Sequence, residues 1–386
     1  MKNVIITDIK YRMAIAAMRE LGKKNYKITA LEFENVAKAK RLGHFSRYAN
    51  ICATVREDEA GFVEDISSLC KNDRPVLLPV NRKSLMAVIN NRDTLKKSCD
   101  FIVPERGSIF LADDKAEIAK IAQRCGVPIP KTTSLKEHKS IEDMAKSVRY
   151  PCIIKFRNGE AMGKKPHERY NIVNTPDEFI GAYKKMHFED EFPIASDYIT
   201  GHDIGVAVVM DEFSCPVDFI CYESLREYPI EGGPTCFLKT VFDRTLLKNA
   251  VAILKEINFT GIAMLDFKGS LENPYFLEIN PRVWGSAAVC DISNSTFFES
   301  YIKAASGNSR QLDLETCSPN YKIGAKMRFT PQSFLCFFSN MKKSSEKGKV
   351  FSEYLRSFFD FSVRDGLFSV KDAKPYLKYI LNLIFG

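Results

Sequence analysis

GIAMLDFKGSLENPYFLEINPRVWGS, residues 261–286, predicts two strands joined by a turn. Because successive side chains of a strand point to opposite faces, Asp266 and Lys268 share one face of the first strand. Glu278 and Asn280 likewise share one face of the second strand. The letters GSLENP between the two runs are rich in turn formers. If the strands form a hairpin centred on this turn, Asp266 lies across from Glu278, with Asn280 one step along.

Two carboxylates that face each other across a hairpin require a positive charge between them. Carboxylate and amide oxygens suit Mg²⁺, which takes one or two carboxylates and leaves its other positions to water and phosphate. Asp266, Glu278 and Asn280 are therefore the candidate metal ligands. Arg282 follows after one proline and is a candidate cation for the anion that the metal holds. The alternative is an ordinary solvent-facing hairpin, because Asp and Glu are mostly exposed in proteins.

The composition is that of a globular protein with two or three domains and a sizeable core, at 386 residues, 45% hydrophobic and 27% charged. The formal net charge of +8 is spread along the chain, which fits anionic substrates but is too dilute to indicate nucleic acid. The 11 cysteines include no C-x-x-C pair, and no signal peptide stands at the start. We therefore expect reduced thiols in a cytoplasmic protein. No apolar run approaches the ~20 residues of a membrane span.

Residues 1–112 predict an open α/β domain with a parallel sheet, because short apolar runs alternate with helical segments. The predicted strands are residues 4–7, 27–33, 76–80 and 100–103. Ligands of such sheets lie beyond the carboxyl ends of the strands, so the loop 7–12 is a candidate substrate wall. The loop lacks a Gly-x-Gly-x-x-Gly fingerprint, so we expect no dinucleotide site. The alternative is a domain that only braces the rest of the chain.

A lysine and a loop further along are candidates for binding phosphate. Another lysine, Lys115, lies in the first turn of a predicted helix, where a lysine is usually a solvated surface residue. Lys155 lies in the apolar run 150–157, and a buried lysine needs an anionic partner. In the loop 158–165, glycines such as Gly163 let backbone N–H groups approach phosphate oxygens. The loop is not a Walker A motif, which has four residues between its glycines and a Ser or Thr after its Lys.

A Pro- and Gly-rich loop within residues 223–240 is flanked by the cations Arg226 and Lys239. Loops of this kind often carry function on a rigid scaffold. Arg226 is a candidate for contact with the γ-phosphate of a nucleotide or with a substrate carboxylate. The alternative is a solvated surface arginine.

The run FLEINPR at residues 276–282, the Asp on the preceding strand and the upstream lysines together resemble the ATP-grasp superfamily of carboxylate–amine or –thiol ligases. The resemblance covers residues 113–307. The pattern E-x-N-x-R is specific when the lysines accompany it and weak alone. It implies an α/β fold, with an N-terminal Rossmann-like (pre-ATP-grasp) domain, a two-lobed ATP-grasp α+β region and a C-terminal extension. The implied domains are residues 1–112, 113–192 for the small lobe, 193–310 for the large lobe with the metal site, and 311–386.

The resemblance also implies where ATP binds. At the hinge of the family, an acidic side chain and the adjoining backbone meet the adenine edge, and Asp197, Tyr198 and Ile199 match this hinge. Asp203 matches the acid that holds the ribose. The hinge acid is usually Glu, so Asp197 is a departure from the pattern.

The phosphate contacts are implied in the same way. A lysine at the position of Lys115 reaches ATP phosphate in the family, and Lys155 is the strongest single candidate for a phosphate ligand in this chain. The loop 158–165 resembles the mobile loop that covers ATP, although it has fewer glycines than most.

The resemblance fades beyond Gly307. Residues 321–330 predict an added strand, and residues 340–349 predict a flexible basic linker. The tail 374–385 has an apolar stripe and two lysines, too few for firm adsorption to a membrane. We expect it to pack on the core of the protein or on a second copy of the chain, which keeps a homodimer open.

These residues suit an ATP-dependent ligase that forms ADP. Such an enzyme phosphorylates a carboxylate to an acyl phosphate, from which an amine or a similar nucleophile then displaces phosphate. Its task is to position the groups and neutralise charge. The implied cofactors are ATP and Mg²⁺ or Mn²⁺, and the partners are a small carboxylate and an amine, without nucleic acid. Three alternatives stay open: phosphorylation of bicarbonate, as in biotin carboxylase or carbamoyl phosphate synthase, nucleotide binding without catalysis, and a scaffold protein.

Overall fold

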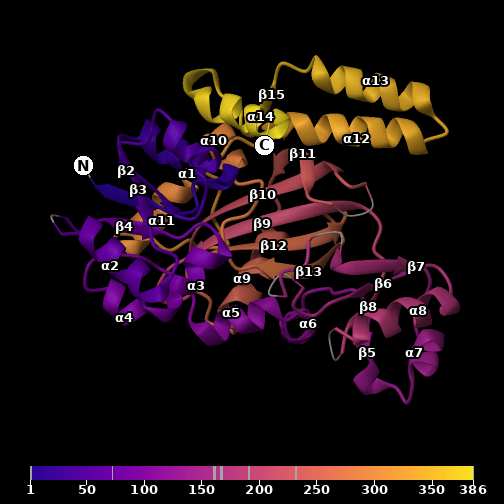
Figure 1. Cartoon of the computed structure of the whole chain (residues 1–386). Helices are drawn as coiled ribbons and strands as arrows, with labels where there is room; N and C mark the ends of the chain where they lie inside the picture. Colours follow the sequence, from indigo (N-terminus) through magenta and orange to yellow (C-terminus); the bar gives the residue numbers. More distant parts are fainter. Residues whose placement is uncertain are drawn as a thin grey trace.

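Three β-sheets organise the part of the chain that the structure describes (Figure 1). The computed structural model describes residues 2–71, 73–159, 162–165, 168–189, 192–230 and 233–385. A parallel sheet forms the N-terminal domain, a four-stranded antiparallel sheet forms a small lobe, and a seven-stranded sheet forms the large lobe. The predicted α/β fold class, with an N-terminal Rossmann-like domain before two α+β lobes, is confirmed.

The N-terminal sheet is parallel and has the strand order β3-β2-β1-β4. Its strands are β1 (Asn3–Ile6), β2 (Lys27–Phe33), β3 (Ile51–Val55) and β4 (Val76–Leu78). The helices of this domain are α1 (Arg12–Lys23), α2 (Glu59–Leu69), α3 (Arg82–Asn90) and α4 (Arg92–Leu95). The prediction of a strand at residues 100–103 is wrong, because only an isolated bridge at Asp100 forms. Pro104 follows and has no N–H with which to continue a ladder.

The small lobe follows two connecting helices, α5 (Arg106–Asp113) and α6 (Lys115–Arg124). Its antiparallel sheet has the order β5-β8-β6-β7. The strands are β5 (Thr132–Ser134), β6 (Cys152–Lys155), β7 (Tyr170–Val173) and β8 (Ile194–Asp197). Helices α7 (Ile141–Ser147) and α8 (Pro176–His187) close a separate core around Ile154, Phe179 and Tyr183. In Figure 1 this lobe lies at the end of the molecule away from the N-terminal domain.

The large sheet has the order β13-β12-β9-β10-β11-β14-β15. Its strands are β9 (His202–Met210), β10 (Pro216–Glu227), β11 (Thr235–Val241), β12 (Gly261–Gly269), β13 (Pro274–Asn280), β14 (Lys326–Arg328) and β15 (Val363–Asp365). The associated helices are α9 (Arg244–Glu256), α10 (Ala288–Ile292) and α11 (Phe297–Ala305). The predicted hairpin of residues 261–286 is confirmed as β12 and β13. The predicted added strand is confirmed as β14, so the C-terminal extension completes the sheet.

The C-terminal extension contains α12 (Thr330–Lys343), α13 (Lys347–Phe358) and α14 (Lys374–Phe385). The prediction of a linker at residues 340–349 is wrong, because only three residues separate α12 from α13 and the rings of Phe337 and Tyr354 pack the two helices together. Tyr376 and Tyr379 of α14 pack on the N-terminal domain beside Leu42, as predicted for the tail. No helix among the described residues has the length and apolar character needed to cross a membrane.

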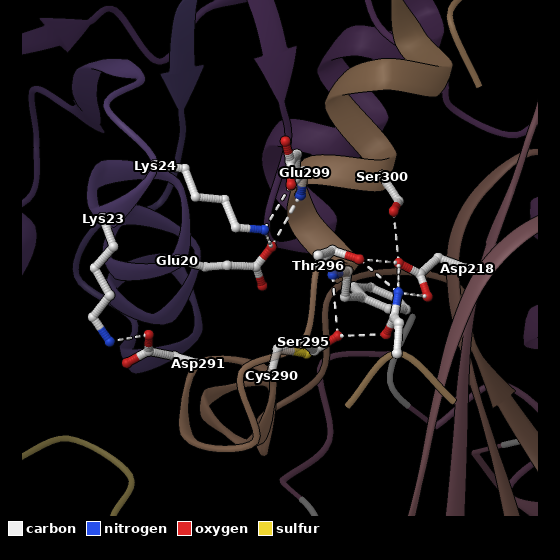
Figure 2. A network of polar contacts seen from close by, with 12 residues as sticks. Glu20, Lys23, Lys24, Asp218, Cys290, Asp291, Ser295, Thr296, Glu299 and Ser300 are labelled. Atoms are coloured by element: carbon white, nitrogen blue, oxygen red, sulfur yellow. Dashed lines mark hydrogen bonds and ion pairs between the residues drawn. The ribbon is translucent and has the colours of Figure 1, made fainter. Parts of the chain in front are cut away.

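Helix α1 is held at its C-terminal half by a network of polar contacts (Figure 2). Glu20 is buried, and its Oε1 accepts a hydrogen bond from the backbone N–H of Glu299 at 3.0 Å. Lys24 donates to the carboxylate of Glu299 at 2.7 Å, and Lys23 pairs with Asp291. Burial raises the pKa of Glu20 to about 8, so this side chain is mainly protonated at neutral pH. These contacts fix α1 against α10 and α11 and so determine where its first turn lies.

Candidate active site

One cavity of about 740 Å³ lies where the N-terminal domain and both lobes meet. Tyr11 and Arg12 line it from the N-terminal domain, Lys155 from the small lobe, and Asp266 from the large sheet. The predicted site residues that line this cavity are Lys115, Lys155, Asp197, Tyr198, Ile199, Asp203, Asp266, Glu278, Asn280 and Arg282. Segments that lie far apart in the sequence, from Tyr11 to Ser286, therefore line one cavity. This cavity is large enough for a nucleotide-sized ligand.

The two acids of the hairpin lie opposite each other, in the register that the sequence predicts. Asp266 pairs with Glu278 across β12 and β13, and the Nδ2 of Asn280 donates to Asp266 Oδ2 at 2.7 Å. Burial and the charge of Glu278 raise the pKa of Asp266 well above its ordinary value. Burial also acts to raise the pKa of Glu278, but Lys115 and Lys155 outweigh it and hold this pKa at about 2.

These residues fit Mg²⁺. Two facing carboxylates in a half-buried position repel each other, and a divalent cation between them would remove the repulsion that raises the pKa of Asp266. The amide of Asn280 donates through Nδ2, which leaves its oxygen as a further ligand. Within the described residues no group of three or more His, Cys, Asp and Glu could hold a metal. Two carboxylates and an amide suffice for Mg²⁺, which keeps several waters and phosphate oxygens.

The cations around the acids come from three separate segments. Lys115 begins α6, and its Nζ lies 2.8 Å from Glu278 Oε2. Lys155 ends β6, is half-buried and forms no ion pair with any residue that the structure describes. Burial lowers the pKa of Lys155, although Glu278 partly offsets this effect. Arg282 follows β13 and donates through Nη1 to the carbonyl oxygen of Val283 at 3.2 Å. These positive groups surround a volume that suits phosphate.

The small lobe and β9 supply the other end of the cavity. Asp197 ends β8, and Tyr198 and Ile199 continue the wall. Asp203 on β9 accepts from Lys268 Nζ at 2.6 Å, because β9 and β12 place these two residues opposite each other. A polar group and an apolar wall side by side suit a flat heterocycle joined to a sugar.

Comparison with known proteins identifies the segment that carries most of these residues. The family model of the ATP-grasp domain matches residues 112–286. Residues 112–286 form an ATP-grasp domain. This match begins just before α6 and ends with the loop after β13. It contains every residue predicted to bind metal, phosphate or nucleotide and leaves out the N-terminal wall of the cavity.

Relatives of the ATP-grasp domain include the pyruvate carboxylase of Bacillus subtilis (strain 168), which is 24% identical over 229 residues. The match covers 54% of this chain and only 19% of the carboxylase. The solved biotin carboxylase domain dimer of the Hydrogenobacter thermophilus 2-oxoglutarate carboxylase, in complex with MgADP, ADP and bicarbonate, has a TM-score of 0.62 at 18% identity and covers 84% of this chain and 73% of its own. The L-amino acid ligase of Bacillus licheniformis has a TM-score of 0.57 at 12% identity and covers 84% and 78%. At these identities the two structures show a shared fold.

Two predicted residues of the ATP-grasp domain do not reach the cavity. Arg226 lies on β10 at a bulge, and its guanidinium stacks on the ring of Tyr354 at 3.7 Å and donates to Ser357 Oγ at 2.9 Å. Glu227, the next residue of the strand, lines the cavity instead of Arg226, because adjacent residues of a strand face opposite sides. Gly163 lies on an exposed turn with φ of 73° and is not part of the lining. Glu160 and Ala161 of the same predicted loop lie outside the described residues.

The structure also adds residues to the site. Glu227 lies 4.0 Å from Lys268, and burial together with Asp203 raises the pKa of Glu227 to about 8. Tyr222 lies over Gly205 so closely that a Cβ added at residue 205 would be 2.2 Å from the ring, so only glycine fits there. Among these added residues, only Lys268 could have been predicted from the sequence, because it shares a strand face with Asp266. Glu227 and Tyr222 depend on the pairing of β9 with β10, which no local pattern predicts.

Proposed function

We propose that this protein is an ATP-dependent ligase that activates a carboxylate as an acyl phosphate, releases ADP and joins the acid to an amine or a similar nucleophile. The observation that carries this proposal is the convergence of Asp266, Glu278, Lys155 and Arg282 on one cavity. Phosphoryl transfer from ATP uses acids that hold a metal ion, a lysine that meets phosphate oxygens and a guanidinium that stabilises the transferred group, and these four residues match those roles. The ATP-grasp domain at residues 112–286 supports the same reaction class.

In this proposal the residues of the cavity bind different parts of the magnesium–ATP complex. Asp266, Glu278 and Asn280 would hold Mg²⁺, which supplies neutralisation of phosphate oxygens when bound. Lys155 binds phosphate oxygens from the small lobe. Lys115 binds them from α6 when the phosphates compete with Glu278 for its positive charge. The hinge at residues 197–199 holds the base and Asp203 holds the ribose.

The reaction then follows in two displacements. A carboxylate oxygen attacks the γ-phosphorus, and the bond from that phosphorus to the bridging oxygen of ADP breaks. Arg282 stabilises the negative charge on the transferred group and on the acyl phosphate. An amine attacks the acyl carbon, phosphate leaves, and the amine loses a proton.

Phosphorylation of bicarbonate is a second candidate, because the relatives include a pyruvate carboxylase and a biotin carboxylase domain bound to bicarbonate. The two reactions share the ATP site and differ in the acid. Release of ADP with bicarbonate alone favours this candidate, and release that requires an organic acid and an amine favours the ligase.

Organisation and location follow from the ligase proposal. We assign residues 1–112 to the N-terminal domain, 113–192 and 193–310 to the two lobes, and 311–386 to the extension. The substrates are small molecules, without nucleic acid. A cytoplasmic location fits an ATP-consuming enzyme whose described cysteines are all free thiols. A homodimer is the proposed assembly, since the related 2-oxoglutarate carboxylase domain is a dimer.

The proposed function is tested by Glu278→Gln in a screen for ADP release over amino acids, peptides and small acids. The substitution keeps the size of the side chain and removes a metal-binding charge, so we expect turnover to fall at least about 100-fold while circular dichroism shows an unchanged fold. The matched control is Glu272→Gln, an exposed acid in the turn of the same hairpin, which should keep full activity. Full activity of Glu278→Gln would contradict the metal assignment.

A further inference from the structure

A cation of the N-terminal domain, Arg12, lies in the cavity and pairs with no carboxylate among the residues that the structure describes. Arg12 is the first residue of α1 and lines the cavity. Its Nε donates to the carbonyl oxygen of Gly285 at 3.0 Å, and its guanidinium carbon lies 3.5 Å from the centre of the Phe329 ring. Among the described residues, Arg12 forms no ion pair and neither of its Nη atoms has a hydrogen-bond acceptor. Burial lowers the pKa of Arg12 to about 10, so the guanidinium stays charged at neutral pH.

A half-buried charge needs compensation for the water that it has lost. The stack on Phe329 supplies part of it as a cation–π contact, and Asp365 adds an electrostatic attraction without forming an ion pair. The bond to Gly285 satisfies only one of the five N–H donors. The donors that remain form the fork that matches the two oxygens of a carboxylate. The chemistry of the position therefore indicates an anion from outside the protein.

The position of Arg12 separates this anion from the triphosphate of ATP. Arg12 contacts Gly285, which lies on the loop after β13, three residues beyond Arg282. The side chains of Tyr11, Met13 and Trp284 line the cavity beside it, none of them from the small lobe that supplies the base and phosphate contacts. Two cations, Arg12 and Arg282, therefore line the cavity on the side of the loop after β13. Arg282 suits the acid that reacts, which leaves Arg12 for a different anionic group.

The position of Arg12 is held rigidly. Lys23 and Lys24 fasten the far end of α1 to α10 and α11 (Figure 2). Arg19 on the same helix forms a buried ion pair with Asp372 at 2.9 Å. A side chain placed by these contacts can discriminate between substrates, because little order has to be gained on binding.

We propose that Arg12 binds a substrate carboxylate that the reaction leaves unchanged, so that one substrate is an α-amino acid or a dicarboxylic acid. This inference rests on the proposed ligase function and names the substrate class of the same site. Trp284 and Met13 add an apolar wall, which suits a short carbon skeleton between the reacting group and the carboxylate.

The test measures the thermal unfolding midpoint of the full chain with a panel of ligands, each with and without the magnesium complex of a non-hydrolysable ATP analogue. The panel contains the common α-amino acids, succinate, glutarate and adipate, together with the corresponding amides. We expect at least one carboxylate to raise the midpoint of the unsubstituted protein by several degrees, and its amide to have no effect. Arg12→Gln should lose this rise, and Arg12→Lys should keep a smaller one, because lysine retains the charge without the fork.

The control is Lys27→Gln, which removes an exposed charge from β2 of the N-terminal domain outside the cavity and should keep the rise. The nucleotide analogue alone should stabilise all variants equally, and its failure to do so would count against the proposed function instead. The inference is overturned if no carboxylate of the panel raises the midpoint, if the amides act equally, or if Arg12→Gln keeps the rise. The amide comparison needs no variant, so a misfolded Arg12→Gln does not remove the test.

Discussion

At the scale of single residues, the site combines paired and unpaired charges. Lys115 and Lys268 each hold a carboxylate within 2.8 Å, whereas Lys155 and Arg12 form no ion pair with a described residue. The paired lysines keep the acids in place before a ligand arrives. An unpaired, half-buried cation costs stability and is expected where a ligand supplies the missing anion. The pattern of pairing therefore separates residues that organise the site from residues that meet the substrate.

Lys155→Met tests this distinction. We expect the dissociation constant of the magnesium–nucleotide complex to rise roughly 10- to 100-fold, since a charged hydrogen bond of about 1.5–3 kcal/mol is lost. The free energy of unfolding should stay the same or increase, because no buried partner is left unpaired. Titration calorimetry and urea denaturation measure the two quantities. Lys120→Met, an exposed change on α6, is the control, and a loss of stability in Lys155→Met without a change in affinity would contradict the assignment.

At the scale of elements, the contact between α1 and α10–α11 sets the position of the cavity's N-terminal wall (Figure 2). The contact includes a buried acid, Glu20, whose Oε2 has no hydrogen-bond partner among the described residues. Burial raises the pKa of Glu20 from the ordinary 4.5 to about 8. A raised pKa in the folded state means that Glu20 contributes most to stability below pH 4.5 and that this contribution is lost as pH rises through 8.

Glu20→Gln should remove this pH dependence. As the pH rises from 5 to 8, one group that binds a proton only in the folded state lowers the free energy of unfolding by up to about 1.4 kcal/mol per pH unit. We expect the difference in stability between the variant and the unsubstituted protein to shift in favour of the variant across this range. Urea denaturation at several pH values measures it. A parallel pH profile for both proteins would show that Glu20 is ionised in the fold.

At the scale of the whole molecule, the C-terminal extension joins the N-terminal domain to the large sheet. Strands β14 and β15 extend that sheet, and Phe329 places a ring under Arg12. Asp372 accepts from Arg19 Nε and from Ser46 Oγ, both at 2.9 Å, so the extension is bonded to two segments of the first domain. The extension therefore helps to form the cavity wall and to hold the domains together.

Asp372→Asn should cost about 3–5 kcal/mol in the free energy of unfolding, because it leaves the buried charge of Arg19 without its partner. The control is Asp291→Asn, which breaks the more exposed pair of Lys23 on the same helix and should cost at most about 1 kcal/mol. Chemical denaturation of the full chain measures both. Equal losses in the two variants would show that the buried pair has no special weight.

The sequence by itself determined the features that depend on neighbours in the chain. Alternation and one turn were enough to place Asp266 across from Glu278, because strand pairing through a short turn is local. Alternation of strands and helices likewise predicted the parallel N-terminal sheet. Lys155 could be named by its type and its apolar surroundings and Lys115 only by the family resemblance, but the approach of both to Glu278 could not be derived from the sequence.

Only the tertiary structure decided which distant groups meet. A bulge in β10 turns Arg226 toward α13 and Glu227 toward the cavity, and a single shift of register reverses the side that each residue faces. Arg12 reaches Gly285 and Phe329 because α1 docks on α10 and α11, more than 270 residues away in sequence. Such contacts depend on how whole elements pack, and the periodicity within one element carries no information about its partner.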